Sequence, residues 1–233
     1  MSSWKTLLLR IGDKCPEYSP SSDFKDHVET CYGVLRRELE PSSNDILPLL
    51  LQCAEQLPHK IPFYATVIGL LNLENEDFVR KVVEKTQTNF QDALYSGNCI
   101  KIRILMRFLT SMMCSKVIQP SSLVVVFETL LSAAATTVDE EKGNPAWQAQ
   151  ADFYITCILS CLPWGGAELT EQVPEEIERV IVGIEAYLSI RSRASESGLS
   201  FFEDDGESEK TNNDKVHFYA KYYLFSEGKL LLL

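Results

Sequence analysis

Hydrophobic residues recur at three- and four-residue intervals along most of this chain, from residue 24 to residue 192. The first such stretch has apolar side chains at Phe24, Val28, Cys31, Tyr32, Leu35 and Leu39. This spacing gathers them on one face of an amphipathic helix, the face that packs into a protein core. We therefore predict a helix here, with Asp23 as the residue that caps its first turn.

Prolines and turn-forming residues divide the periodic region into eight predicted helices. The sequence Pro41-Ser42-Ser43-Asn44 is expected to end the first helix, and a second is expected to start near Asn44 with Pro48 in its first turn. The others are predicted over about 61–72, 75–95, 99–115, 120–136, 145–162 and 174–192. Short connections make consecutive helices antiparallel neighbours.

Before residue 215 no segment alternates with the two-residue period of a β-strand, so an all-α fold is predicted. The helices pair at roughly 40 residues per hairpin, which is the period of HEAT-type repeats. We therefore expect a HEAT-like solenoid of antiparallel helix pairs, about four hairpins long. Asn75 and Asn144 are expected to cap two of its helices, and Asp139-Glu140-Glu141 is expected to form a solvated loop.

The seventh predicted helix meets an unusual run of residues after Leu162. Pro163 cannot continue a helix, and Gly165 with Gly166 supplies the backbone freedom of a tight turn. The helix is therefore expected to stop at Leu162. Trp164 is expected to fill the groove between the seventh and eighth helices as a packing wedge, rather than to serve as a binding-site aromatic.

The composition changes after residue 192. Residues 193–215 are acidic and rich in serine, which predicts a flexible linker. Residues 216–233, VHFYAKYYLFSEGKLLLL, are abruptly aromatic and apolar. This segment fits a strand, a short helix or a stretch that packs back on the helical array. The chain is thus divided into a helical domain over 1–192, a linker and a divergent tail.

Composition and charge narrow the functional classes. With 233 residues, 45% of them hydrophobic, the chain can bury a core without disulfides or metals. Its net charge of −11 argues against binding nucleic acid or an anionic membrane over its whole surface. The seven cysteines form no C-x-x-C pair and are expected to be reduced thiols in the cytosol or nucleus. No membrane partner is expected.

Catalytic signatures are missing from the sequence, which has no Walker loop, no G-x-S-x-G and no H-E-x-x-H. Cys157 and Cys161 are one helical turn apart and could supply two metal ligands. A zinc site needs about four ligands, and no histidine or further cysteine lies nearby in the sequence. We expect both to be buried apolar thiols, and we expect no metal, cofactor or catalytic residue.

Basic residues concentrate in one predicted helix, CIKIRILMRFLTSMMCSK over 99–116, which carries no acidic residue. Lys101, Arg103 and Arg107 are the candidates for a partner-docking basic face there. Such a face could receive an acidic segment or a phosphate. The alternative is a solvated face, or one paired with acidic residues of a neighbouring helix, since surface charges usually contribute little.

Several sequence blocks resemble one known family. They are LPHKIPFYATVIGLLN (57–72), FLTSMMCSKVIQPSSLVVVFETLLS (108–132) and CILSCLPWGGAEL (157–169). They look like the N-terminal helical domain of the large subunits of nuclear cap-binding complexes, which is related to the middle domain of translation initiation factor 4G. The fingerprint residues of this resemblance are Tyr64, Asn72, Pro163, Trp164 and Gly165.

The resemblance implies a scaffold rather than a catalyst. In such complexes a small subunit with an RNA-recognition fold holds the methylguanosine cap. The large subunit braces it and recruits factors for splicing, export and decay, so capped RNA is contacted indirectly. The implied location is the nucleus, and also the cytoplasm. Arg107 is the one basic residue that belongs to the family motif.

The resemblance stops after Lys215, and the two later helical domains of such large subunits are absent from this sequence. Because those domains make most of the contact with the small subunit, we expect that contact to be weak or lost, as in a truncated product. The alternatives are a generic HEAT-type adaptor in translation or transport, or a fragment without cap-complex activity. An all-α enzyme that uses Cys157 and Cys161 ranks far behind.

Overall fold

The computed structural model describes residues 3–14, 23–140 and 145–199, and every regular element within them is helical. The prediction of an all-α fold is confirmed. The chain divides into two compact units, with the boundary between Leu123 and Val124. The predicted cap Asn144, the predicted tail over 216–233 and the predicted linker beyond Leu199 lie outside the described residues.

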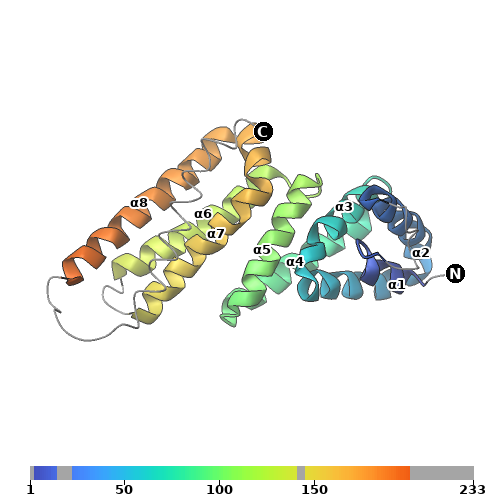
Figure 1. The fold of residues 1–233 in the computed structure, drawn as a ribbon, viewed down its shortest axis with the longest axis horizontal. Helices are drawn as coiled ribbons and strands as arrows, with labels where there is room; N and C mark the ends of the chain where they lie inside the picture. Colours follow the sequence, from blue (N-terminus) through green and yellow to red (C-terminus); the bar gives the residue numbers. More distant parts are fainter. Residues whose placement is uncertain (1–2, 15–22, 141–144, 200–233) are drawn as a thin grey trace. The chain divides into compact units, whose positions relative to one another are not determined.

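The first unit holds α1 to α5, and its core is built around α3 (Figure 1). Its elements are α1 (Trp4–Arg10), α2 (Phe24–Gln56), a 3-10 turn η1 (Pro58–Lys60), α3 (Ile61–Asn72), α4 (Glu76–Tyr95) and α5 (Cys99–Cys114). α3 packs against α2, α4 and α5. Tyr64 of α3 and Phe108 of α5 are among the largest fully buried side chains. Consecutive helices pair as HEAT-like hairpins, as predicted.

Helix α1 was not predicted, because its apolar run is too short to show a helical period. The buried side chain of Lys60 donates to the Leu9 carbonyl at 2.8 Å and pairs with Asp13 at 2.8 Å. The backbone N–H of Gly12, at a φ of +81°, donates to His27 Nδ1 at 3.0 Å. These contacts hold α1 and the turn after it against the rest of the unit. No local sequence pattern predicts these contacts, so they become visible only in the folded structure.

Helix α2 corrects the predicted break at Pro41. It is one helix of 33 residues with Pro41 and Pro48 inside it. Both prolines are exposed, while the buried positions Leu39 and Ile46 continue one stripe across them. A proline removes one helical hydrogen bond, and water can satisfy the freed carbonyl on the solvent side. The continuous core face therefore outweighs the local breakers.

The predicted caps are partly confirmed. Asp23 and Asp26 form a reciprocal capping box at the start of α2, with distances of 2.9 and 3.1 Å. Asn75 precedes α4, but its side chain makes no capping hydrogen bond. Asn98 fills that role for α5, where its side-chain oxygen accepts from the Lys101 N–H at 3.0 Å.

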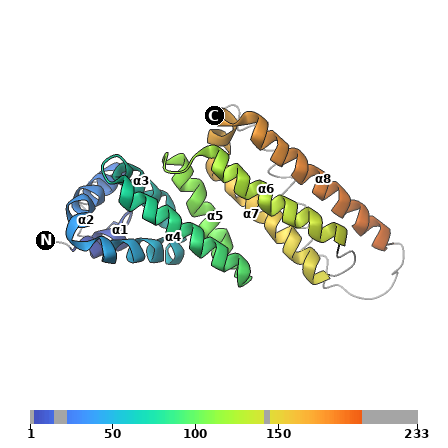
Figure 2. The ribbon, with the colours of Figure 1, turned by 180° about the vertical axis from the view of Figure 1, so that it is seen from behind.

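The second unit holds α6 (Pro120–Glu140), α7 (Pro145–Gln172) and α8 (Pro174–Leu199). The boundary between the units falls within the first turn of α6, so the second unit begins at Val124. The three lie side by side in both views (Figures 1 and 2). In α8 the buried side chains Ile177, Val180, Ile184 and Tyr187 follow the predicted spacing. Two predicted ends are wrong, because Asp139 and Glu140 belong to α6 and α8 continues into the predicted linker as far as Leu199.

Helix α7 also overturns the predicted stop at Leu162. It continues through Pro163 and both glycines to Gln172. The extension buries Gly165 and Leu169, four residues apart, in line with Cys161 before them. The predicted wedge is wrong as well, because Trp164 is 39% exposed. Burial of the small Gly165 and the apolar Leu169 on one face thus keeps the helix intact past the proline.

Among the described residues, α6 alone is long and apolar enough to cross a bilayer, by length and composition only. Core helices of water-soluble proteins pass the same test, so this is weak evidence for a membrane span. About a quarter of its apolar window is buried within the fold (28%). Its large apolar residues Leu123, Val124, Phe127 and Leu130 are buried, and most of its exposed positions carry small or hydroxyl side chains.

Candidate docking surfaces

The three predicted docking cations all lie on α5, which is deeply embedded in the first unit. Every residue from Phe108 to Met113 is buried, so the second half of this helix offers little surface. Arg103, in the first half, is exposed, and Arg107 one turn later is half-buried. These two arginines share a side of the helix, as predicted.

Lys101 does not share that side, which corrects the prediction of one basic face. Its ammonium group pairs with Glu55 of α2 at 3.1 Å, and Glu55 also accepts from Asn89 of α4 at 3.2 Å. Two residues of separation rotate a side chain by about 200° around a helix, which turns Lys101 away from Arg103. The alternative of pairing with a neighbouring acidic residue therefore holds for Lys101.

The fingerprint residues do not gather into one site. Tyr64 is fully buried in α3, and Asn72 is the half-buried last residue of that helix. Pro163, Trp164 and Gly165 belong to α7 of the second unit. Burial raises the pKa of the Tyr64 hydroxyl, and the neighbouring Cys53 raises it further. Tyr64 is therefore a neutral core residue.

Cys157 and Cys161 are both fully buried in α7, which agrees with the interpretation as core thiols. Metal ligation would need further donors around them. Within the described residues, no three His, Cys, Asp or Glu side chains come together in a metal-binding group.

A partly buried polar cluster joins α7 to α8 and was not predicted. Asp152 accepts from the Tyr187 hydroxyl at 2.5 Å and from Arg191 at 3.0 and 2.7 Å. Arg191 also donates to Gln148 at 3.0 Å. Burial and the Asp152 carboxylate raise the pKa of Tyr187, and the same carboxylate raises that of Arg191. The only signal in the sequence is the i, i+4 spacing of Tyr187 and Arg191.

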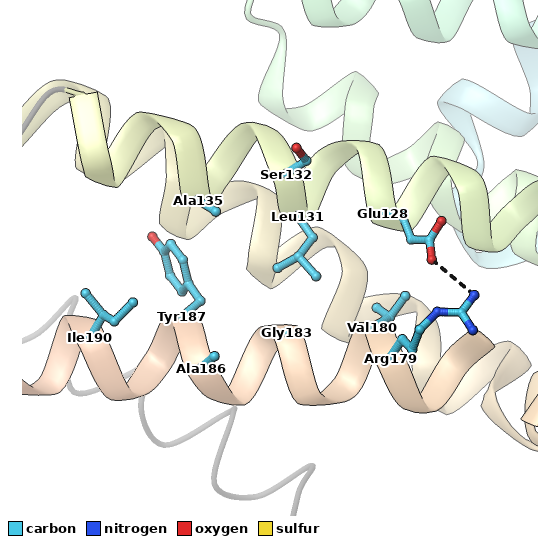
Figure 3. A pocket seen from close by; sticks show the side chains of 10 residues that line it. All are labelled: Glu128, Leu131, Ser132, Ala135, Arg179, Val180, Gly183, Ala186, Tyr187 and Ile190. Atoms are coloured by element: carbon cyan, nitrogen blue, oxygen red, sulfur yellow. Dashed lines mark ion pairs between the residues drawn. The ribbon is translucent and has the colours of Figure 1, made fainter. Parts of the chain in front are cut away.

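An elongated apolar groove runs between α6 and α8 beside this cluster (Figure 3). Its volume is about 370 Å³. Ala135 and Ala186 line it with small side chains, Tyr187 and Leu131 point into it, and Ile190 lies at one end. The other end is marked by the ion pair between Glu128 and Arg179, 3.7 Å apart.

A second hollow lies between α2 and α4 in the first unit and is more polar. Leu39 and Phe78 contribute apolar surface to it, while Arg36, Glu40 and Lys81 contribute charge. Arg36 is also ion-paired with Glu74. Both hollows are open and shallow, which suits the surface of another protein better than a small substrate.

Comparison with known proteins gives the family. The MIF4G domain family matches residues 10–211. The nuclear cap-binding protein subunit 1 of Arabidopsis thaliana is 72% identical over 215 residues, which are 92% of this chain and 25% of that protein. The protein of the same name from Oryza sativa subsp. japonica is 58% identical over the same shares. The one from Homo sapiens is 32% identical over 81% of this chain and 22% of its own length.

The chain therefore spans about a quarter of the length of the curated relatives it matches. The resemblance drawn from the sequence blocks over 57–72, 108–132 and 157–169 is confirmed.

Proposed function

Because the chain belongs to the MIF4G domain family, a family of non-catalytic helical domains, we propose that it is a scaffold module of a nuclear mRNA cap-binding complex. One observation carries the proposal, the 72% identity to a nuclear cap-binding protein subunit 1 over 92% of the chain. Identity at this level, spread over both units, covers surface as well as core positions.

The surfaces described above support protein binding rather than catalysis. The strongest polar cluster, around Asp152, is occupied in joining α7 to α8. The two hollows are open, and one of them is largely apolar. Aliphatic and aromatic surface of this kind is used to bind protein segments, whether of a partner or of the same chain.

The proposed partners are RNA-processing and export factors in the nucleus, with passage to the cytoplasm. A chain with 33 acidic and 22 basic residues favours partners with basic surfaces over direct contact with RNA. Contact with the small cap-binding subunit is proposed to be weak, and capped RNA is contacted through partners. The proposal thus assigns recruitment, not cap recognition, to this chain.

A titration tests the proposal. Recombinant 1–233 is titrated with the small cap-binding subunit, with and without a fluorescent cap analogue, and is also used to capture proteins from Arabidopsis nuclear extract. We expect little change in cap affinity, together with recovery of splicing or export factors. Recovery of translation or transport proteins alone would contradict the cap-complex assignment and favour a generic adaptor.

The exposed arginine of α5 provides a sharper test of docking. We expect Arg103→Glu to reduce recovery of these factors while the melting temperature stays within about 2 °C of wild type, because surface substitutions usually cost under about 0.5 kcal/mol. Lys25→Glu is the matched control on another exposed cation. Arg107→Glu is expected to lower the melting temperature because Arg107 is half-buried. Equal recovery with Arg103→Glu and Lys25→Glu would remove α5 from the docking surface.

A further inference from the structure

The apolar groove between α6 and α8 lacks a cover among the described residues. Ile190, which lines the groove, is 50% exposed, and Val125 of α6 and Val182 of α8 are 59% and 55% exposed. Single exposed apolar residues are ordinary, but Ile190 lines the same groove as the small apolar side chains of Ala135 and Ala186. A surface of this kind gains free energy when apolar side chains cover it.

The groove is shallow and its lining is largely apolar. Its two walls meet closely at Gly183, where an added Cβ would lie 2.5 Å from Leu131 Cδ2. Tyr187 of α8 points toward Ala135 of α6, whose small side chain leaves room for the ring (Figure 3). Because the lining is largely apolar, a segment that covers the groove must bring apolar groups and few charges.

The chain itself contains a segment of that composition. Residues 216–233 hold Phe218, Tyr219, Tyr222, Tyr223, Leu224, Phe225 and the four leucines 230–233. Phe218, Tyr222 and Phe225 follow the i, i+4, i+7 spacing of a single apolar face. We propose that residues 216–233 bind in cis along the groove between α6 and α8.

The length of the chain permits this return. From Arg179 at one end of the groove to Leu199 at the end of α8, a helix rises about 30 Å. Residues 200–215 can span about 50 Å when extended, so residue 216 can reach any point along the groove.

Charge favours the same occupant. The charges that line the groove, Glu128 and Arg179, are paired with each other, and the further exposed carboxylates Glu175, Glu178 and Glu185 lie on α8. The segment 216–233 carries Lys221 and Lys229 against a single acid, Glu227. The preceding residues 203–209 are strongly acidic, so they would be repelled from this surface and leave it to the segment that follows.

The test uses the full chain and places a photo-crosslinker, p-benzoylphenylalanine, at position 222 in place of tyrosine. Crosslinked peptides are mapped by mass spectrometry after irradiating an equal mixture of ¹⁴N- and ¹⁵N-labelled protein. We expect crosslinks within one isotopic chain to α6 residues 125–135 and α8 residues 179–190. Mixed-isotope crosslinks would identify a second copy of the chain as the occupant of the groove. Crosslinks to other residues would show that position 222 does not lie in the groove. Either result overturns the proposal.

A matched pair of groove variants completes the test. Ala135 lines the groove and Ala133 does not, although both are exposed on the same helix. Ala135→Glu is expected to reduce the groove crosslinks about tenfold, because it places an uncompensated carboxylate under an apolar segment. Ala133→Glu should leave them unchanged, with circular dichroism confirming both folds. Equal crosslinking in the two variants would contradict the proposal, whatever becomes of the cap-complex assignment.

Discussion

At the scale of single residues, burial decides the chemistry of the thiols and phenols in this protein. Cys31, Cys53, Cys157 and Cys161 are buried, whereas Cys99 and Cys114 are exposed at the two ends of α5. Burial raises the pKa of Cys53, which keeps it in the unreactive thiol form. The sequence predicted that Cys157 and Cys161 are buried thiols, and this is confirmed. The prediction was possible because both fall on the apolar stripe of a long helix.

This contrast predicts a labelling pattern. In native protein at neutral pH, iodoacetamide should modify Cys99 and Cys114 at least about tenfold faster than the four buried cysteines, because thiolate access controls the rate. Peptide mass spectrometry reads each site separately, and a denatured sample is the control in which all sites react alike. Rapid modification of Cys53 in the native protein would contradict its placement in the core.

The raised pKa of Tyr187 predicts how the free energy of unfolding depends on pH in the alkaline range. The folded pKa of Tyr187 is raised above its unfolded value of about 10, so its stabilising contribution is complete below pH 10 and is lost as the pH rises toward the folded pKa. Between those two values each such tyrosine steepens the fall in unfolding free energy by about 1.4 kcal/mol per pH unit. Urea melts from pH 9 to 11.5 should therefore show a shallower fall for Tyr187→Phe than for wild type. Identical slopes would mean that Tyr187 ionises freely in the folded protein.

At the scale of helices, local signals and core packing compete, and packing decides where they disagree. The starts at Phe24, Pro120 and Pro174 were predictable because a cap or a first-turn proline marks them. The breaks expected at Pro41 and Pro163 do not occur, because buried stripes continue in register beyond both prolines. The position of a helix end thus depends on contacts with distant residues, which a local pattern does not contain.

The continuation of α7 predicts that Pro163 is destabilising. Pro163→Ala should restore one backbone hydrogen bond and raise the free energy of unfolding by about 1–2 kcal/mol, after allowance for the greater entropy of the unfolded chain. Pro174→Ala is the matched control, since Pro174 is the first residue of α8 and has no helical N–H to restore. If the helix ended at Leu162 as the local pattern suggested, Pro163→Ala would not stabilise the protein.

The exposure of Trp164 gives a companion prediction. Trp164→Ala should cost about 2–3 kcal/mol, below the 3–5 kcal/mol of a buried tryptophan, because 39% of the residue is already in water. Leu169→Ala, at a fully buried position of the same helix, should cost about 2–5 kcal/mol. Chemical denaturation measures both. A loss for Trp164→Ala above about 4 kcal/mol would restore the packing role.

The cluster around Asp152 predicts how α8 is held. Asp152→Asn removes the charge that Arg191 and Tyr187 share and should cost about 2 kcal/mol, because charged hydrogen bonds contribute about 1.5–3 kcal/mol. Hydrogen exchange should rise in α8 near residues 184–191. Glu185→Gln, an exposed charge removed from the same helix, should change neither quantity. If hydrogen exchange in α8 is unchanged in Asp152→Asn, apolar packing alone holds α8 against α7.

At the scale of the whole molecule, the sequence predicted the fold class and the family but not the docking surfaces. The fold class and the family followed from the sequence, because helical periodicity and the blocks around Tyr64 and Pro163 survive in the primary structure. The docking surfaces did not follow. The groove of the second unit exists only where α6 and α8 lie together, and Lys101 is removed from the basic face by Glu55, 46 positions away in the chain. Surfaces of this kind are assembled from residues that no local pattern connects.

Net charge predicts the response to RNA. At −11 the chain should not bind an uncapped RNA oligonucleotide at about 150 mM salt, with any dissociation constant weaker than about 100 μM. Fluorescence anisotropy measures this, and a salt series separates electrostatic binding from artefact. Micromolar, salt-sensitive binding would reveal a local basic patch and would weaken the assignment of indirect RNA contact.

The two prolines inside α2 have a consequence for folding kinetics. Each one penalises the isolated helix by about 3 kcal/mol, so a helix of 33 residues cannot form ahead of its neighbours. α2 must condense together with the helices it packs against, chiefly α1 and α3. The first unit is therefore expected to assemble through a late, collective transition state, and a synthetic peptide of residues 24–56 should remain unfolded in water although the same segment is the longest helix of the described chain.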